Sequence, residues 1–338
     1  MSRNKKRFNS RLAFFLFGIL LFIILIYRIN PQVVLDNFSK IGLWFFVTCF
    51  IAFCWIFLQS LAWAIVQSAF QPVPFLTLFR AKVMADGLNT LLPTANMGGE
   101  AARALIIKKH SPLQEGIPGI VFDKTIEYVA SLVYLAAGLF ISLLYLKVPE
   151  SLKIPSLVVL FTTGVGTIIL VFLQFKGVYK ILEKLAALFP KAKKWLLEKE
   201  KLLRQFDVNM RLLFSHSWIK LMGALTLHII SRLLGAMEIF VIIKALGLPA
   251  TLVKVIFISV FVVIMNTAFF LIPGQWGAAE GANLLAAVTV GYPASVGLSI
   301  GIVRRARKIF FAALTVLLLF LRKEKLKLKD IRPEEPEK

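Results

Sequence analysis

Long runs of apolar residues dominate the chain, and they set the expected fold. Most of them exceed the ~18 residues that a helix needs to cross a bilayer. A membrane β-barrel would show short alternating strands instead. We therefore predict an all-α polytopic membrane protein with about six spanning helices. The expected spans are Leu12–Tyr27, Ile41–Phe70, Ile117–Leu146, Pro155–Gln174, Trp218–Leu246 and Pro293–Leu321.

Two further apolar segments, Phe75–Ile107 and Val253–Val290, carry proline, glycine and charge in their middle. A proline lacks an amide donor and ends a helix, and glycine lets the chain turn. Broken backbone at membrane depth is tolerated only inside protein or beside a wet cavity. We predict two re-entrant broken-helix hairpins, although two kinked helices would also fit. The expected turn residues are Pro93, Gly98, Gly99, Pro273, Gly274 and Gly277.

The two broken segments match each other at a shift of 180 residues, because Pro93 aligns with Pro273 and a glutamate follows each proline seven residues later. The flanking apolar runs keep the same shift, which predicts an internal repeat. We place the first copy at about 41–146 and the second at about 218–321. The predicted topology inverts one copy relative to the other. Many transporters have such inverted repeats, with the substrate site at the repeat interface.

Basic residues account for the formal net charge of +22, and they gather in Arg3–Arg11, Lys176–Arg211 and Arg322–Lys329. Such clusters are typical of cytoplasmic segments and attract anionic membrane lipids. We therefore place both termini in the cytoplasm, together with an amphipathic linker at 175–217 and a tail at 322–338. No segment indicates a nucleic-acid partner.

The sequence shows no candidate catalytic, metal or cofactor site. Cys49 and Cys54 lie five residues apart in one predicted helix, too far apart for a disulfide. The chain has only three histidines. It contains no nucleophile elbow, phosphate-binding loop or dinucleotide fingerprint.

Charged residues inside the predicted spans are the candidate substrate-binding groups. Asp123 and Glu127 share a helix face, and such a pair needs a cation or proton. Arg304 would lie about 25 Å from the cytoplasmic end of the last span, unless that span begins only at Ile309. Embedded arginines need an anion, either a protein carboxylate (Asp123, Glu127, Glu100 or Glu280) or a lipid phosphate. The candidates are Glu100, Arg103, Asp123, Glu127, Glu280, Arg304, Arg307 and Lys308.

His228 and Arg232 also share a helix face in the span Trp218–Leu246. We interpret His228 as a packing residue rather than a proton relay.

The two broken-segment motifs resemble a known family. Leu-Leu-Pro followed by Gly-Gly-Glu-Ala-Ala-Arg (Leu91–Arg103), with Leu-Ile-Pro-Gly-x-x-Gly-x-x-Glu (Leu271–Glu280), is similar to the transmembrane region of lysylphosphatidylglycerol synthase/flippase proteins. The chain departs from it at Thr94-Ala95-Asn96, where glycine is commoner. The resemblance, from about Leu12 to Leu321, implies a stand-alone member without the aminoacyl-transferase domain, in a prokaryotic inner membrane.

The resemblance and the embedded charges together predict a flippase for a phospholipid or a lipid-linked headgroup. A homodimer is also compatible with this prediction. The alternatives are a membrane enzyme acting on a lipid phosphate or a polyprenyl-linked sugar, and an accessory subunit of lipid biosynthesis.

Overall fold

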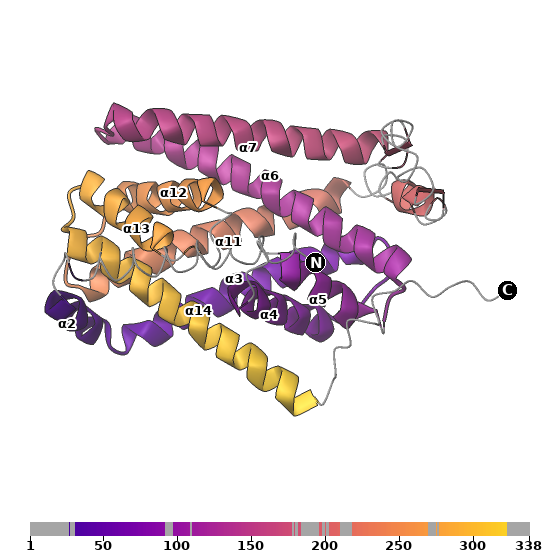
Figure 1. Cartoon of the computed structure of the whole chain (residues 1–338), viewed down its shortest axis with the longest axis horizontal. Coiled ribbons are helices and arrows are strands. Elements are labelled where there is room, and N and C mark those ends of the chain that lie inside the picture. The colour runs from indigo at the N-terminus through magenta and orange to yellow at the C-terminus, as the bar shows by residue number, and fades with distance from the viewer. Residues whose placement is uncertain are drawn as a thin grey trace, which may run out of the picture.

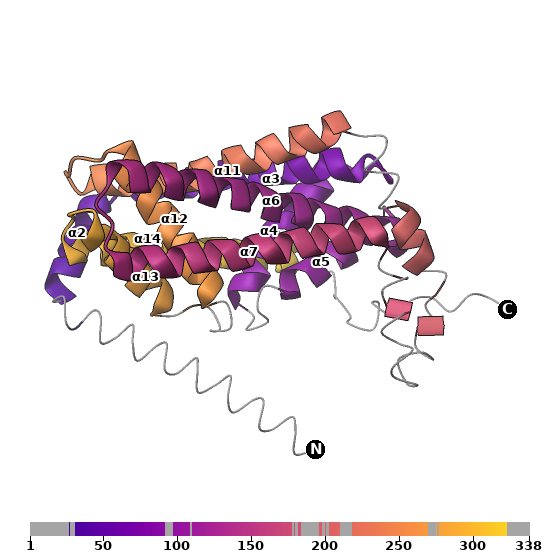
Figure 2. The ribbon, with the colours of Figure 1, turned by 90° about the horizontal axis from the view of Figure 1, so that it is seen from above.

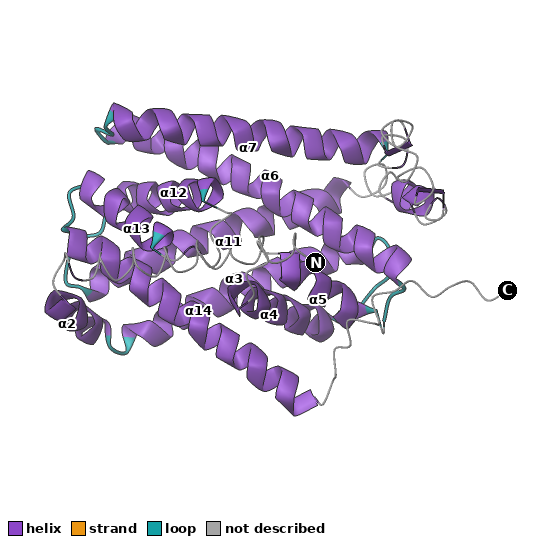
Figure 3. Cartoon of the chain, in the orientation of Figure 1, coloured by secondary structure: helices purple, strands orange, loops and turns teal. Residues whose placement is uncertain are grey.

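The computed structural model describes residues 27, 31–91, 97–108, 110–177, 179, 182–183, 196–197, 200, 203–209, 218–269, 275 and 277–322. Within these ranges the chain forms helices and no strand (Figure 3), which confirms the all-α prediction there. Several predicted features lie outside the described residues: almost all of the first span Leu12–Tyr27, the turn residues Pro93, Pro273 and Gly274, most of the 175–217 linker, and residues 323–338.

The described helices follow the predicted apolar runs closely. The exception is α2, which occupies a stretch where the sequence indicated no helix and ends before the bend at Gly42 and Leu43. The main helices are α2 (Pro31–Ile41), α3 (Trp44–Gln67), α4 (Phe75–Leu91), α5 (Met97–Ile107), α6 (Leu113–Tyr145), α7 (Glu150–Lys176), α11 (Trp218–Ala245), α12 (Leu252–Ala268), α13 (Ala278–Thr289) and α14 (Ala294–Arg322).

Four of the described helices are long and apolar enough to cross a membrane: α3, most of α6, α7 and α11. They correspond to four of the six predicted spans. The last predicted span also folds as one helix, the 29-residue α14, but its central charges keep it below the same apolar standard.

Helices α3 and α11 pack against each other at the centre of the bundle and run in opposite directions (Figure 1). The Gln59 side chain donates to Ser231, while Lys220 near the start of α11 donates to Ser68 just after α3. These pairs define two ends of the bundle. At the first end α3 begins and α11 finishes, and at the second end α3 finishes and α11 begins.

Each broken segment is a pair of helices that returns to the end from which it started. Helices α4 and α5 pack together and connect α3 to α6 at the second end, where Gly119 of α6 lies directly against Gln67. Helices α12 and α13 connect α11 to α14 at the first end, where the Tyr292 hydroxyl donates to the Pro249 carbonyl oxygen.

The first helix of each pair packs against the long helix that follows the other pair. Gly87 of α4 lies under Thr315 of α14, so closely that any side chain there would collide with the threonine. Gly138 of α6 is similarly close to Val260 of α12. The two halves of the chain are thus interlocked rather than stacked as separate domains.

The backbone at the first break is held by a side chain. The Gly99 amide donates to Asn89 Oδ1 at 2.8 Å, and a Cβ on Gly99 would lie only 2.4 Å from the Ala85 carbonyl oxygen. Gly98 lies beside it in α5. At the second break, Gly277 has φ +72°, a conformation that favours glycine. Gly99 therefore lets α5 lie close to α4, and Gly277 allows the turn before α13.

Candidate functional site

Four helices bring eight polar residues into one network, the Asp123 cluster. Helix α6 supplies its centre because Asp123, Lys124 and Glu127 lie within about one turn of each other. Helices α4, α5 and α11 surround that turn. The cluster consists of Lys82 (α4), Glu100 and Arg103 (α5), Asp123, Lys124 and Glu127 (α6), and His228 and Arg232 (α11).

The Arg103 guanidinium is fully buried and links two carboxylates. Its Nη2 lies 2.6 Å from Asp123 Oδ2, and its Nη1 lies 2.9 Å from Glu100 Oε2. The guanidinium also stacks on the Trp63 ring of α3, at 3.9 Å from the ring centre. Because arginine combines charge with a flat, weakly hydrated face, it suits such a dry, stacked position.

The like-charged pair on α6 is relieved by cations from three sides. Lys82 Nζ lies 3.7 Å from Asp123 Oδ2 and 3.5 Å from Glu127 Oε2. Glu127 also pairs with Lys124 at 3.1 Å and with Arg232 at 3.2 Å. The prediction that Asp123 and Glu127 need a positive partner is confirmed, and the protein itself provides one.

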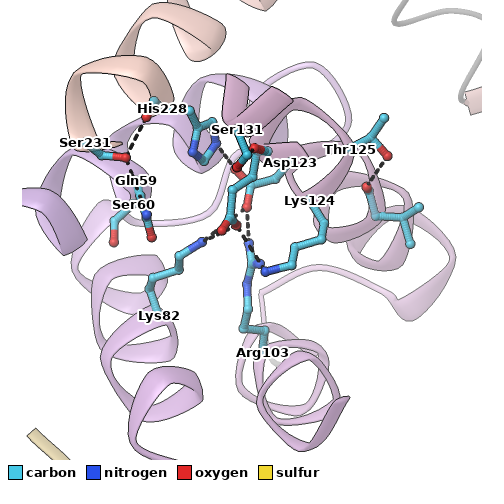
Figure 4. A network of polar contacts seen from close by, with 12 residues as sticks. Gln59, Ser60, Lys82, Arg103, Asp123, Lys124, Thr125, Ser131, His228 and Ser231 are labelled. Carbon is cyan, nitrogen blue, oxygen red and sulfur yellow. Dashed lines mark hydrogen bonds and ion pairs between the residues drawn. The ribbon is translucent and has the colours of Figure 1, made fainter. Parts of the chain in front are cut away.

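His228 is a member of this network. Its Nε2 lies 3.0 Å from Asp123 Oδ1, and both side chains are fully buried. An ionised carboxylate can only accept a hydrogen bond, so Nε2–H is the donor. Figure 4 shows His228, Lys82 and Arg103 pointing towards Asp123 from different directions. We interpreted His228 as a packing residue whose polar atoms are satisfied, and the structure agrees in that the buried ring bonds the central carboxylate.

A small cavity of about 60 Å³ lies beside the Asp123 cluster. Its lining mixes both signs of charge with amides, including Lys82, Glu100, Asp86, Gln59 and Asn89. A polar cavity of this size holds a few waters. Glu100 and Lys124 are each 27% exposed, so this side of the cluster is open.

The second half of the chain builds its own charged group, the Glu238 cluster, from α11, α13 and α14. Glu238 is fully buried; Arg304 Nε donates to its Oε2 at 3.1 Å, and Arg307 Nε forms an ion pair with its Oε1 at 2.6 Å. On the neighbouring face of α14, Arg305 pairs with Glu280 of α13.

Glu280 also holds the start of α13, because its Oε2 accepts the Gly277 amide at 2.8 Å. The helix dipole favours a carboxylate at this position. Gly301 of α14 allows the close approach, since a Cβ there would lie 3.2 Å from Glu280 Cα. Glu280 is therefore both a cap and an ion-pair partner.

The two clusters share part of their construction, because α3 and α11 contribute to both. In the Glu238 cluster the Arg307 guanidinium stacks on the Trp55 ring, 4.3 Å from the ring centre. In the Asp123 cluster the Arg103 guanidinium stacks on the Trp63 ring in the same way. The two tryptophans are eight residues apart on α3, about 12 Å along the helix. Asp123 and Arg304 each lie ten residues into their helices, about 15 Å from opposite ends of the bundle.

Lys308 differs from Arg304, Arg305 and Arg307 because it is exposed. No described carboxylate forms an ion pair with it, although Asp86 of α4 acts on it electrostatically. Asp86 also lines the cavity beside the Asp123 cluster. Asp86 therefore lies between the two clusters.

The eight predicted substrate-binding residues fall into two groups rather than one site. Glu100, Arg103, Asp123 and Glu127 meet in the first cluster, and Glu280, Arg304 and Arg307 belong to the second, with Lys308 beside it. For the arginines of the last span we named either a protein carboxylate (Asp123, Glu127, Glu100 or Glu280) or a lipid phosphate as the partner. Glu280 does pair with Arg305. The protein partner of Arg304 and Arg307 is Glu238, which was not among the carboxylates named.

Six members of these clusters were not among the predicted site residues: Lys82, Lys124, His228, Arg232, Glu238 and Arg305. Each is an ionisable residue in an otherwise apolar helix, which is itself a signal. A lone glutamate in the span Trp218–Leu246 requires a cation, and unpaired arginines were available in the last span. Among the described residues, no group of three or more histidine, cysteine, aspartate or glutamate side chains has an arrangement that could hold a metal ion.

Comparison with known proteins adds one finding to this geometry. No curated protein and no solved structure matches the chain. The family model of the lysylphosphatidylglycerol synthase transmembrane region matches residues 11–315, which include both clusters and both helix pairs. The chain belongs to that family of membrane proteins.

Proposed function

We propose that this protein moves a phospholipid or a lipid-linked headgroup from one leaflet of the membrane to the other. The observation that carries the proposal is the exposed Lys308 at the centre of α14, with Arg304 one turn away and 20% exposed. Lys308 is 14 residues from either end of α14, about 21 Å in each direction. A cation there needs water or an anion.

The length of α14 supports a path through the membrane. Its 29 residues extend about 43 Å, enough to cross the ~30 Å hydrocarbon core of a bilayer. Lys308 and Arg304 would then face a wet or phosphate-filled passage at mid-membrane. Arginine binds phosphate through two parallel hydrogen bonds, and lysine binds it as a point charge.

The arrangement of the helix pairs supports alternating access. We infer that α4–α5 and α12–α13 are re-entrant hairpins and that the two halves are inverted repeats, because each pair returns to its own end and α3 opposes α11. Transporters built this way bind substrate between the repeats. We place the second end in the cytoplasm of a prokaryotic cell, because the basic linker and tail continue from helices that finish there.

In the proposed mechanism, a lipid phosphate competes with Glu238 for the arginines of α14. Arg304 is the better exchange partner because Arg307 is 2% exposed and stacked on Trp55. Asp86 connects this position to the cavity at the Asp123 cluster, whose open face presents Glu100 and Lys124. The headgroup would thus meet charges of both signs on its way.

Reconstitution into liposomes tests this proposal. Nitrobenzoxadiazole-labelled phosphatidylglycerol in the inner leaflet becomes accessible to dithionite only after translocation. We expect Arg304→Gln and Lys308→Gln each to reduce the rate at least about tenfold, equivalent to losing ~1.4 kcal/mol of phosphate binding. Arg304→Lys should restore part of it, because lysine keeps the charge and loses the fork.

The matched control is Lys153→Gln, which removes an exposed cation of α7. Wild-type rates in both α14 variants, at equal folded yield, would remove the phosphate-binding role. Thin-layer chromatography of the recovered lipid distinguishes transport from chemistry: an altered lipid would indicate the enzyme alternative instead.

A further inference from the structure

An open apolar groove runs along the outside of the bundle between α6 and α7, away from both charged clusters. Its volume is about 440 Å³, within the ~300–1,000 Å³ typical of ligand pockets. Helix α7 lies along the outside of the bundle (Figure 2). The groove is lined by Val129 and Leu132 of α6 and by Thr167, Ile168, Val171, Phe172, Phe175 and Lys176 of α7.

The groove is long and follows the helix axis. The lining residues of α7 recur every three or four positions from Thr167 to Lys176, which extends about 14 Å along one face. Thr167 contributes no free hydroxyl because its Oγ1 donates to the Thr163 carbonyl oxygen at 2.8 Å. The groove therefore offers an apolar channel parallel to the direction in which α7 crosses the membrane.

The groove persists because α6 and α7 are tied together at one point and carry small residues beyond it. Gln174 donates to Thr125 at 2.7 Å near the second end. Farther along α7, a Cβ on Gly164 would only touch Leu132 of α6, at 3.6 Å. The two helices therefore leave space between them that their own side chains do not fill.

One end of the groove is positively charged. Lys176 is the last residue of α7, and Gly177 at φ +96° turns the chain away after it. The Lys176 ammonium lies 5.6 Å from the centre of the Phe172 ring, so its stem covers the groove while its charge lies at the second end. The basic stretch 176–211 begins at this residue.

We propose that this groove binds one acyl chain of an anionic phospholipid from the leaflet at the second end, with the lipid phosphate beside Lys176. The apolar lining matches a hydrocarbon chain, the direction matches that of chains in a leaflet, and the charge is complementary to an anionic headgroup. A second copy of this chain would bring a helix, which is wider than the groove between two packed helices. The site is independent of the translocation path.

Quenching by brominated lipids tests the site in nanodiscs. Phe172→Trp places an indole in the groove, and Phe161→Trp places one on α7 outside it, at a position that is 72% exposed. The fluorescence of the parent protein, with its own six tryptophans, is subtracted. The probes are phosphatidylglycerol and phosphatidylcholine with brominated chains, at equal mole fraction.

We expect brominated phosphatidylglycerol to quench Trp at position 172 with an apparent affinity about fivefold higher than brominated phosphatidylcholine, the effect of one lysine near an anionic headgroup. At position 161 the two lipids should be equivalent. Adding Lys176→Gln should abolish the preference at position 172 without changing the quenching at position 161.

Three results would overturn the proposal. Equal quenching by both lipids at position 172 would mean that the groove does not select charge. Quenching at position 161 alone would mean that protein, such as a second copy, covers the groove. A preference that survives Lys176→Gln would mean that the phosphate lies elsewhere. If Phe172→Trp lowers the folded yield, Phe175→Trp, also in the lining, replaces it.

Discussion

The Asp123 cluster and the Glu238 cluster use the same parts in different proportions. In the first, four cations and three carboxylates from four helices form one continuous network around a buried aspartate. In the second, three arginines of one helix share two glutamates, and Lys308 adds an exposed cation. The first cluster is nearly neutral, and the second has an excess of positive charge.

This difference separates two roles for ionisable groups inside a membrane protein. A buried charge is costly unless each partner is satisfied, and removing one partner leaves the other uncompensated. The Asp123 cluster pairs its charged members with one another and ties α4, α5, α6 and α11 together. The Glu238 cluster leaves positive charge available to a ligand. We therefore expect the first to dominate stability and the second to dominate transport.

Asp123→Asn should have the largest effect on folding. It leaves Arg103, Lys82 and His228 without their common carboxylate in a fully buried position. We expect a loss of about 3–5 kcal/mol, as for other broken buried pairs. Thermal unfolding and folded yield in detergent measure it. The control is Glu150→Gln, which removes an exposed pair of α7 and should cost under ~1 kcal/mol. An unchanged melting temperature in Asp123→Asn would refute the anchoring role.

Glu238→Gln should lower the stability of the protein less than Asp123→Asn does, and it should impair transport more. Its two partners lie on one helix, and Arg304 is 20% exposed, so water compensates part of the loss. We expect about 2–3 kcal/mol, below the cost of a fully buried pair, together with tighter binding of an anionic lipid. Differential scanning fluorimetry with and without phosphatidylglycerol separates the two effects. A loss of stability larger than that of Asp123→Asn would reverse the comparison.

The smallest effects should come from the stacked tryptophans. Trp63→Phe and Trp55→Phe keep an aromatic face under Arg103 and Arg307 but weaken the cation–π contact. We expect each to cost about 1 kcal/mol, because phenylalanine keeps part of a contact worth ~1–2 kcal/mol. Parallel unfolding curves of both variants provide the measurement. A marked difference between them would show that the two clusters do not share this part of their construction.

Much of the fold follows from the sequence, because period and length are local properties. The apolar run Pro155–Gln174 predicted α7, and the breaks at Pro93 and Pro273 predicted where paired helices separate. Helix α2 was missed because its 11 residues are too few for an apolar-run criterion. Its position against α14, with Asn37 donating to Ser299, is a tertiary contact.

The sequence predicted which types of residue form the candidate site, but it predicted only some of the ion pairs between them. An ionisable residue within an apolar run is visible in the sequence, and so is the demand for a counter-charge. Arg304 and Arg307 were identified in this way. Their partner Glu238 was not, because it lies 66 and 69 positions away in the sequence and shares no local pattern with them.

The sequence by itself determined that the chain forms apolar helices, that two of its segments are interrupted, and that charged residues lie within otherwise apolar helices. These features depend on neighbouring residues and on the cost of burying polar groups. Only the tertiary structure decided which charges meet. The packing of α3 and α11 places Trp63 against Arg103 and Trp55 against Arg307. It also divides the charged residues between the nearly neutral Asp123 cluster and the positively charged Glu238 cluster. Pairing across helices depends on packing geometry, which no local pattern contains.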